Sequence, residues 1–301
     1  MTSVVIAAHN ESAVIGRCLD ALLADAAPGE LDVTVVANGC TDATASVAAA
    51  RPGVRVVDTA EAGKAKALNL GDAVAVGYPR IYLDADITAS TFVVRTLVEA
   101  LDRGARPPAG GIPVLAVVPR RELDVRGRPL LVRGYFAINK RLPAFRSGLF
   151  GRGVIALSEA GRRRFDTFPE MVADDLFLDS LFDAAEKQEA TAVATVVAAP
   201  LRTRDLVRRL VRVRRGNAAM RAAGRSGEVA VDVRHADRWA WLREVVLPQP
   251  WLAPAAVVYV GITALAAVLA RRSSSNGDSW GRDESTRTKA EAMNDGEDSD
   301  G

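Results

Sequence analysis

The stretch Tyr82-Leu83-Asp84-Ala85-Asp86-Ile87 decides how this sequence is organised. Its apolar start predicts the end of a buried strand, and two aspartates separated by one residue follow at the carboxyl end of that strand. Ligands of open α/β sheets bind at that edge. Two closely spaced carboxylates suit a hard divalent cation such as Mg²⁺ or Mn²⁺. The alternative interpretation is a solvated turn in which an aspartate caps the next helix.

Strands and helices alternate through the first hundred residues around this stretch. Apolar runs predict strands at 3–8, 31–36, 54–57 and 80–83, with helical patterns after each of them. This alternation predicts an α/β fold with a mostly parallel sheet, right-handed crossovers and helices on both faces. The loops after the four strands then meet at one edge, and they are residues 10–11, 38–42, 60–64 and 84–86.

Two common nucleotide-binding signatures are missing from the sequence. No G-x-G-x-x-G follows the first strand, which disfavours a dinucleotide-binding domain, and no G-x-x-x-x-G-K-[ST] is present either. A nucleotidyltransferase would need a glycine-rich loop where Ala7-Ala8-His9-Asn10 stands. These signatures therefore do not explain the polar loops.

The later part of the chain alternates less regularly. We predict strands at 112–118, 150–157 and 191–199 and helices at 130–140 and from Asp174 onward. Gly151 and Gly153 break the middle strand, as glycines do where backbone or ligand approaches closely. The acidic first turn at Asp174-Asp175 also suits the helix dipole. Nine arginines follow between Arg202 and Arg225.

Composition limits the possible classes of protein. The chain has 301 residues, of which 49% are hydrophobic, and a net charge of +2. This is the profile of a folded protein, and it gives no overall case for a nucleic-acid partner. The two cysteines, Cys18 and Cys40, lack metal-ligand spacing and fit a reducing compartment, with Cys18 in a core. We expect no signal peptide, because a strand begins at Ser3.

An ordered set of motifs resembles family 2 glycosyltransferases of the GT-A (nucleotide-diphospho-sugar transferase) fold. The resemblance covers about residues 3–225 and rests on His9-Asn10-Glu11, residues 35–42, residues 63–69, Asp84-Ala85-Asp86, Gly151-x-Gly153, Asp174-Asp175 and the Arg-rich segment. No single motif is specific, but their order is. The resemblance implies a transferase that uses a nucleoside-diphosphate sugar.

The resemblance also implies roles for individual residues. The nucleotide sugar is expected to contact Ala8, Asn10, Glu11, Asn38, Asp42, Lys64 and Asp84. Asp86 and Asp84 would bind the metal, Mg²⁺ or Mn²⁺, that stabilises the leaving diphosphate. The family usually has an acidic pair where this chain has Ala37-Asn38, and this departure leaves the base of the nucleotide open. Asp42 is equally well explained as a helix cap, and Lys64 as a surface lysine.

Catalysis and acceptor binding are implied by the later motifs. Asp175 matches the family's catalytic base, which takes a proton from the acceptor hydroxyl, and one direct displacement inverts the anomeric configuration. Gly151, Gly153 and Asp174 are expected near the acceptor. Arg212 and Arg215, with Arg208 at helical spacing, would reach the diphosphate. The alternative is that these arginines form a basic helix face that is exposed to solvent or lies on anionic lipid. Arg215-Gly216-Asn217 replaces the aromatic motif of processive synthases, which indicates single transfers.

The end of the chain carries a different signal. Residues 252–270 have no charge, are about long enough to span a bilayer, and follow Trp239, Trp241 and Trp251. A buried hairpin arm or an interfacial helix remains an alternative. We therefore predict a GT-A domain at 1–230, a membrane-associated helical segment at 235–272 with a single transmembrane helix at 252–270, and a disordered acidic tail at 273–301.

The predicted function is the inverting, metal-dependent transfer of one sugar to an acceptor hydroxyl on a lipid or a cell-envelope glycan. Nucleotide sugars are cytoplasmic in bacteria, so the catalytic domain is expected at the cytoplasmic side of the membrane. One alternative is a polyprenyl-phosphate sugar transferase, whose anionic acceptor needs no base. Another is a non-catalytic scaffold that binds nucleotide or membrane through the basic segment.

Overall fold

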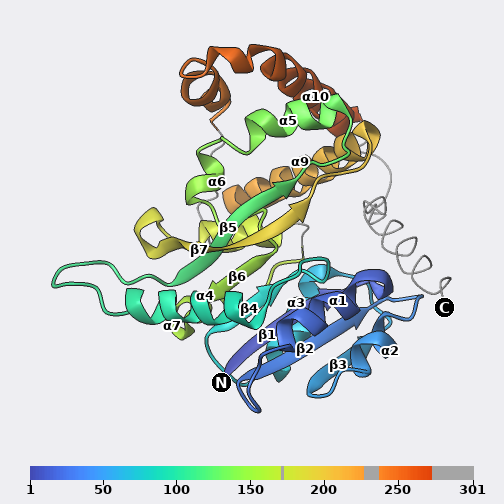
Figure 1. Ribbon diagram of the computed structural model, residues 1–301, viewed down its shortest axis with the longest axis vertical. Helices are drawn as coiled ribbons and strands as arrows, with labels where there is room; N and C mark the ends of the chain where they lie inside the picture. Colours follow the sequence, from blue (N-terminus) through green and yellow to red (C-terminus); the bar gives the residue numbers. More distant parts are fainter. Residues whose placement is uncertain (171–172, 227–236, 273–301) are drawn as a thin grey trace, which may run out of the picture. The chain divides into compact units, whose positions relative to one another are not determined.

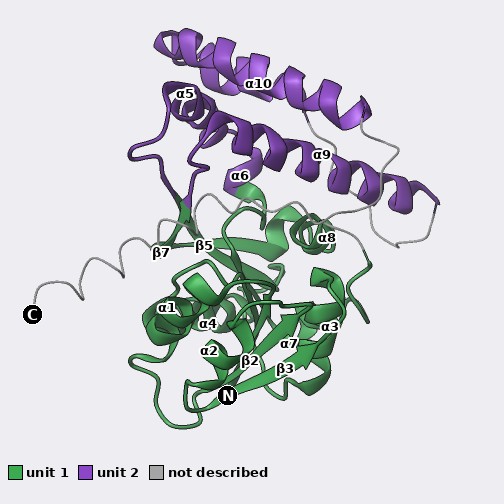
Figure 2. Cartoon of the chain, turned by 90° about the vertical axis from the view of Figure 1, so that its right-hand side faces the viewer, with its two compact units in different colours: residues 1–122, 147–197 green, residues 123–146, 198–301 purple. Residues whose placement is uncertain are grey.

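The computed structural model describes residues 1–170, 173–226 and 237–272 (Figure 1). The chain divides into two units, coloured separately in Figure 2. Unit 1 holds Met1–Glu122 and Ser147–Val197, and unit 2 holds Leu123–Arg146 and Ala198–Gly301. The predicted boundary near residue 230 and the predicted disordered tail lie outside the described residues.

Unit 1 begins with the predicted alternation of strands and helices. The strands are β1 (Thr2–Ala8), β2 (Leu31–Asn38), β3 (Val54–Thr59) and β4 (Arg80–Leu83). The helices are α1 (Ser12–Leu23), α2 (Thr44–Ala49), α3 (Lys64–Val74) and α4 (Thr91–Gly104). Ser90 caps α4 by accepting a hydrogen bond from the Val93 amide at 3.4 Å.

The sheet has seven strands in the order β3-β2-β1-β4-β6-β5-β7. β1 pairs in parallel with β2 and β4, and β2 pairs in parallel with β3. β6 (Val154–Leu157) runs antiparallel to β4 and to β5 (Ala116–Asp124). The predicted α/β fold is confirmed, and the half of the sheet beyond β4 contains antiparallel pairs.

The later elements differ in places from the sequence prediction. The strand expected at 112–118 begins at Ala116, and the one expected at 150–157 begins at Val154. Gly151 and Gly153 have φ values of +74° and +69°, which no strand accommodates, so the strand starts after them. The other elements of unit 1 are α7 (Glu159–Arg162), α8 (Asp174–Ser180), a 3₁₀ turn η1 (Ala184–Glu186) and β7 (Lys187–Ala198).

Helices cover both faces of the parallel strands. α1 packs against α2 and α4, whereas α3 packs on β1 and β2. Right-handed crossovers in the order β3-β2-β1-β4 place α3 on the face opposite α1 and α2. The core between these layers is apolar, with fully buried side chains that include Ile6, Ile15, Leu19, Ile81 and Leu97. Cys18 is buried among them, as predicted.

Unit 2 is mostly helical over its described residues, apart from the ends of β5 and β7. It contains α5 (Leu130–Asn139), α6 (Ala144–Ser147), α9 (Thr203–Ser226), the π-helical turn η2 (Trp241–Val246), the 3₁₀ turn η3 (Pro250–Leu252) and α10 (Ala253–Arg272). Tyr135 and Phe136 of α5, Leu206 and Val207 of α9, and Ile262 of α10 share one apolar core. The predicted apolar segment 252–270 is therefore a helix that packs on two others.

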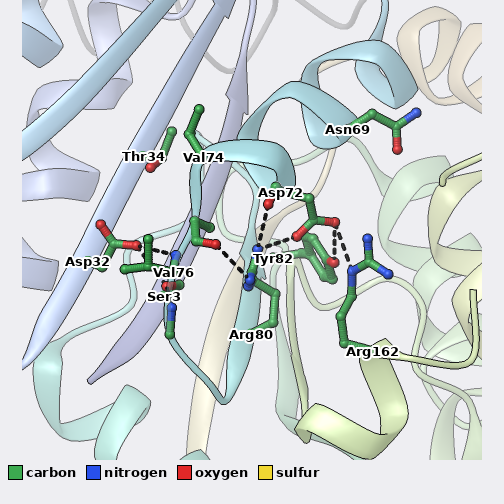
Figure 3. A network of polar contacts seen from close by, with 12 residues as sticks. Ser3, Asp32, Thr34, Asn69, Asp72, Val74, Val76, Arg80, Tyr82 and Arg162 are labelled. Carbon is green, nitrogen blue, oxygen red and sulfur yellow. Dashed lines mark hydrogen bonds and ion pairs between the residues drawn. The ribbon is translucent and has the colours of Figure 1, made fainter. Parts of the chain in front are cut away.

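A buried polar network joins three elements of unit 1 (Figure 3). Asp72 of α3 accepts hydrogen bonds from Arg80 at 2.6 Å, from the Tyr82 hydroxyl at 2.7 Å and from Arg162 of α7 at 3.0 Å. The Asp72 side chain is only 5% exposed. Because Tyr82 lies two residues before Asp84, this network fixes the strand that ends in the two aspartates.

Replacing Asp72 by alanine should strongly destabilise the protein. Asp72→Ala leaves two largely buried guanidinium groups without their carboxylate, and such a loss costs about 3–5 kcal/mol of unfolding free energy. Urea unfolding followed by circular dichroism measures the change. The matched control is Asp20→Ala, which removes a solvent-exposed pair with Arg51 and should cost less than about 1 kcal/mol. Equal losses in the two variants would contradict the prediction.

Candidate functional site

The carboxyl ends of β1, β2 and β4 bring the predicted loops to one edge of the sheet. Ala8 lies beside Ala37 in the β1–β2 register, so the loops after these strands are neighbours. β6 is antiparallel, and Leu83 pairs with Val154. The start of β6 therefore meets the end of β4, where the Asp84 amide donates to the Gly153 carbonyl at 2.8 Å.

Asn38 ties three of these loops together. Its side-chain nitrogen donates to the Ala8 carbonyl at 2.7 Å, and its side-chain oxygen accepts from the Gly63 amide at 3.0 Å. The side chain of Asn38 is buried, at 1% exposure. The His9 ring nitrogen Nδ1 lies 2.5 Å from the Asn38 carbonyl. These contacts favour a role in shaping the loops, and pairing of Asn38 with a nucleotide base stays a prediction.

Asp42 and Asn10 hold the first two helices in place. Asp42 accepts hydrogen bonds from the amides of Ser12 and Thr44, both at 3.0 Å, so it joins the starts of α1 and α2. Partial burial would raise the pKa of Asp42, but the hydrogen bonds from Thr44 and Ser12 lower it overall. Asn10 has φ +53° and accepts from the Thr41 amide at 2.8 Å. Asp42 lies one residue before the N-cap of α2, Ala43, so it binds the first amide of that helix without occupying the N-cap position.

Glu11 completes this first loop. It is buried, and its amide donates to the Thr44 hydroxyl at 2.7 Å. Thr44 also binds Asp42, so it links both acidic residues, and the sequence analysis did not single it out. A threonine at the start of a helix is so common that its position alone carries little signal.

Lys64 lies between two carboxylates from distant parts of the chain. Its ammonium group is 2.7 Å from Asp84 Oδ1 and 2.8 Å from Asp174 Oδ2. Burial would lower the pKa of Lys64, but Asp174 and Asp84 hold it well above its usual value. Lys64 is therefore charged, and it brings the first turn of α8 to the end of β4. The alternative of an ordinary surface lysine does not describe this half-buried bridge, and contact between Lys64 and the nucleotide stays a prediction.

Asp175 lies next to this bridge. It is half-buried, and its Oδ1 accepts from the Leu176 amide at 2.8 Å. Burial, together with the charge of Asp174, raises the pKa of Asp175 to about 6, while Lys64 acts to lower it. Asp175 thus keeps a proton more readily than an ordinary aspartate but is mostly ionised at neutral pH.

The packing of α8 positions Asp174 and Asp175. Phe177 contacts Phe165 with ring centroids 5.3 Å apart, and Phe168 in turn lies 5.0 Å from Tyr82. Asn69 of α3 exchanges two hydrogen bonds with the backbone of Phe168, at 2.7 Å and 3.0 Å. No local sequence pattern indicates this role for Asn69, because its partner is ninety-nine residues away.

The pair Asp84 and Asp86 fits a divalent cation. Both belong to one turn, closed by the Ile87 amide and the Asp84 carbonyl at 3.0 Å, and Asp86 is exposed. A Cβ at Gly153 would lie 2.3 Å from Ile87 Cγ1 and 3.3 Å from Asp84 Oδ2, so the glycine lets this backbone pack closely against the turn that carries the two aspartates. No three His, Cys, Asp or Glu side chains form a metal site within the described ranges. The remaining ligands would be phosphate or water oxygens, as is usual for Mg²⁺.

Arg212 and Arg215 belong to α9 in unit 2. The carboxylates described above belong to unit 1. Contact between these arginines and a diphosphate therefore stays a prediction. Gly151 and Gly153 lie in unit 1 immediately before β6, and their expected role in acceptor binding is likewise a prediction.

Comparison with known proteins agrees with this arrangement. Residues 3–130 match the family model described as glycosyl transferase family 2. None of the curated proteins compared with the chain matches it. Two solved structures are similar, with 22% identity each: mannosyltransferase PcManGT from Pyrobaculum calidifontis in complex with GDP-Man and Mn²⁺, and glucosyl-3-phosphoglycerate synthase from Mycobacterium tuberculosis in complex with Mn²⁺, UDP and glucosyl-3-phosphoglycerate.

The extent of these two similarities supports the fold. The first has a TM-score of 0.55 and covers 90% of this chain and 79% of the other. The second has a TM-score of 0.51 and covers 74% and 79% respectively. Both similar structures are glycosyltransferases, and the predicted GT-A architecture is consistent with them.

Asp175→Asn should stabilise the protein above pH 6 and have little effect near pH 4. The folded pKa of about 6 exceeds that of an unfolded aspartate, so the folded state binds the proton more tightly. The free energy of unfolding of the natural protein therefore falls as pH rises from about 4 to about 6 and stays lowered above that range. Urea unfolding at several pH values measures this difference.

Asp174→Asn is the matched control, because it removes a neighbouring carboxylate that already has an ammonium partner. It should give no comparable gain in stability at high pH. A gain for Asp175→Asn that is the same at pH 4 and pH 8 would contradict the raised pKa.

Proposed function

We propose that this chain is a glycosyltransferase that moves one sugar from a nucleoside-diphosphate donor to an acceptor hydroxyl, with inversion and with a divalent cation. The observation that carries this proposal is the convergence at one sheet edge of the Asp84–Asp86 turn, the Lys64 bridge and the half-buried Asp175. Phosphate-binding oxygen ligands and a carboxylate base are the two components that this chemistry needs.

The comparisons support the class of donor. The matching family model covers residues 3–130, which include every nucleotide-contact residue proposed in unit 1. The two similar structures contain GDP-Man or UDP together with Mn²⁺. By analogy, this chain uses a nucleoside-diphosphate sugar and Mn²⁺ or Mg²⁺.

Asp175 acts as the base in this proposal. The acceptor O–H transfers its proton to the Asp175 carboxylate as the acceptor oxygen attacks the anomeric carbon. The bond from that carbon to the diphosphate oxygen breaks, and the nucleoside diphosphate leaves with the electron pair. A single displacement of this kind inverts the anomeric configuration. A pKa of about 6 leaves Asp175 ionised at neutral pH but more basic than an ordinary aspartate.

The other residues bind and orient. Asp84 and Asp86 would hold a divalent cation, which when bound offsets negative charge on the diphosphate. Ala8, Asn10 and Glu11 border the nucleoside from the β1 loop. Lys64 keeps Asp174 and Asp84 together, so that Asp175 is presented at the edge where the donor binds.

The acceptor is proposed to be a lipid or a bacterial cell-envelope glycan. Arg215-Gly216-Asn217 lacks the aromatic residue of processive synthases, which supports single transfers over polymerisation. α10 is long and apolar enough to associate with a membrane, and the catalytic unit would lie at the cytoplasmic side, where nucleotide sugars are found. The closing basic residues Arg271 and Arg272 suit a polar headgroup region.

Purified full-length protein should slowly hydrolyse one member of a panel of nucleotide sugars when Mn²⁺ is present. Asp86→Ala should lower this turnover at least about a hundredfold, since the charge on the leaving diphosphate is no longer offset. Chelation by EDTA should abolish it, and added Mn²⁺ or Mg²⁺ should restore it. Product analysis by chromatography measures the rate.

Asp102→Asn is the control for this experiment, because Asp102 is an exposed carboxylate on α4. It should keep the natural rate. If no nucleotide sugar binds with or without metal, the transferase proposal is wrong and a scaffold role is favoured. If Asp175→Asn still transfers sugar, the acceptor is an anion that needs no base, such as a polyprenyl phosphate.

Lys64→Met should shift the pH profile of kcat/KM. Lys64 lowers the pKa of Asp175, so its removal raises that pKa above about 6. The acid limb of the profile should move to higher pH, and the loss of rate should be larger at pH 6 than at pH 8. Lys66→Met is the matched control, since Lys66 lies two residues away in an exposed pair with Glu61. An unshifted acid limb in Lys64→Met would argue against Asp175 as the base.

A further inference from the structure

The charge of this chain is divided unequally between its two units. The described residues of unit 2 include nineteen Lys and Arg but only four Asp and Glu, which gives a net charge of +15. The described residues of unit 1 include sixteen Lys and Arg and twenty-three Asp and Glu, which gives −7. The overall value of +2 therefore hides a strongly basic unit.

The basic unit also exposes a continuous apolar helix face. α10 has no charged residue from Ala253 to Ala270. Its solvent-facing side chains recur at helical spacing and include Val257 at 74% exposure and Leu265 at 49%, with Val260, Val268 and Leu269. Trp251 and Leu247, in the turns before the helix, are 71% and 65% exposed. Apolar surface of this extent is normally covered by a partner.

The opposite face of α10 is already covered by protein. Ala256, Ile262 and Ala266 are buried, and Val258 lies against Gly134 of α5. Ile262, Leu206 and Val207 belong to one core, which joins α10 to α9. The two helices also lie side by side in Figure 2.

This packing is unsuitable for a helix that crosses a bilayer. α9 carries eight arginines, and among them Arg204 and Arg208 are largely exposed to solvent. If α10 spanned the membrane with α9 beside it, these charges would enter the hydrocarbon, where arginine is costly. A helix that is apolar on one side and packed on a basic layer on the other suits the membrane surface.

We propose that unit 2 docks on the surface of an anionic lipid bilayer, with α10 lying in the plane of the interface and its exposed face in the acyl region. Trp251 and Leu247 insert beside α10, and the basic side chains of unit 2 attract the anionic headgroups. This inference rests on the membrane association proposed above and is independent of the proposed sugar chemistry.

The combination of features favours a bilayer over other occupants. A nucleic acid would satisfy the charge of +15 but not the aliphatic face of α10, since it offers phosphates and planar bases. A second copy of the chain would cover the aliphatic face, but it would bring together two units of the same large charge. An anionic membrane satisfies both features at once.

Vesicle co-sedimentation of the full-length protein tests this docking surface. The protein should bind vesicles of phosphatidylcholine that contain roughly 30% phosphatidylglycerol. Its affinity for vesicles of phosphatidylcholine alone should be at least about tenfold lower. Val257→Glu with Leu265→Glu should weaken binding to the mixed vesicles at least about tenfold. The matched control is Val76→Glu with Ile112→Glu, which adds the same charge at exposed apolar positions of unit 1 and should leave binding within about twofold.

Alkaline carbonate treatment of membranes from expressing cells distinguishes docking from spanning. Release of the protein supports the docked helix, whereas retention in the pellet overturns it in favour of a transmembrane helix. Absence of vesicle binding also overturns the docking proposal. In that case, a double variant Val257→Glu with Leu265→Glu that converts a dimer to a monomer in analytical sedimentation would show that a second copy of the chain covers α10. Donor hydrolysis measured without vesicles reports on the enzyme separately.

Discussion

The ammonium group of Lys64 is the interaction on which the site depends. Asp84, Asp174 and Asp175 come from two regions about ninety residues apart in sequence, and all three are acidic. Brought together without a cation, such carboxylates would repel or take up protons. Lys64 contacts Asp84 and Asp174 at 2.7 and 2.8 Å and leaves Asp175 beside them with a raised pKa. One lysine therefore both links the two regions and limits how far burial and Asp174 raise the pKa of Asp175.

The same edge illustrates how structural and chemical roles share one set of side chains. Asn38 and Asp42 use their polar atoms to join loops and helix starts, so hydrogen bonds within the protein hold these loops to one another. Asp72 likewise accepts a hydrogen bond from Arg80, at the start of the strand that leads to Asp84. A site whose supports are buried and hydrogen-bonded loses little entropy when it binds a flexible substrate, and it holds a reacting group in a defined position.

Much of this arrangement followed from sequence pattern, and the rest depended on contacts between distant residues. The four parallel strands, their helices and the edge where the loops meet were predicted, because hydrophobic period and loop polarity are local signals. The antiparallel placement of β6 was not predicted, because no local residue pattern indicates the position or direction of a strand within a sheet. The bridge at Lys64 was missed for the same reason: its partners were each visible, but nothing in the sequence indicated that they meet. The separation of a basic helical unit was obscured by the small overall charge.

The order of the strands has a consequence for biosynthesis. β1 to β4 all precede residue 84, and in the folded protein they pair with one another, with β4 also pairing with β6. Asp174 is made about ninety residues later, which at typical rates of synthesis is roughly 5–20 seconds. During that interval the nascent chain already carries Lys64 and Asp84 but lacks Asp175. The residues of unit 1 that are proposed to hold the donor are therefore synthesised well before the proposed base, Asp175 of α8.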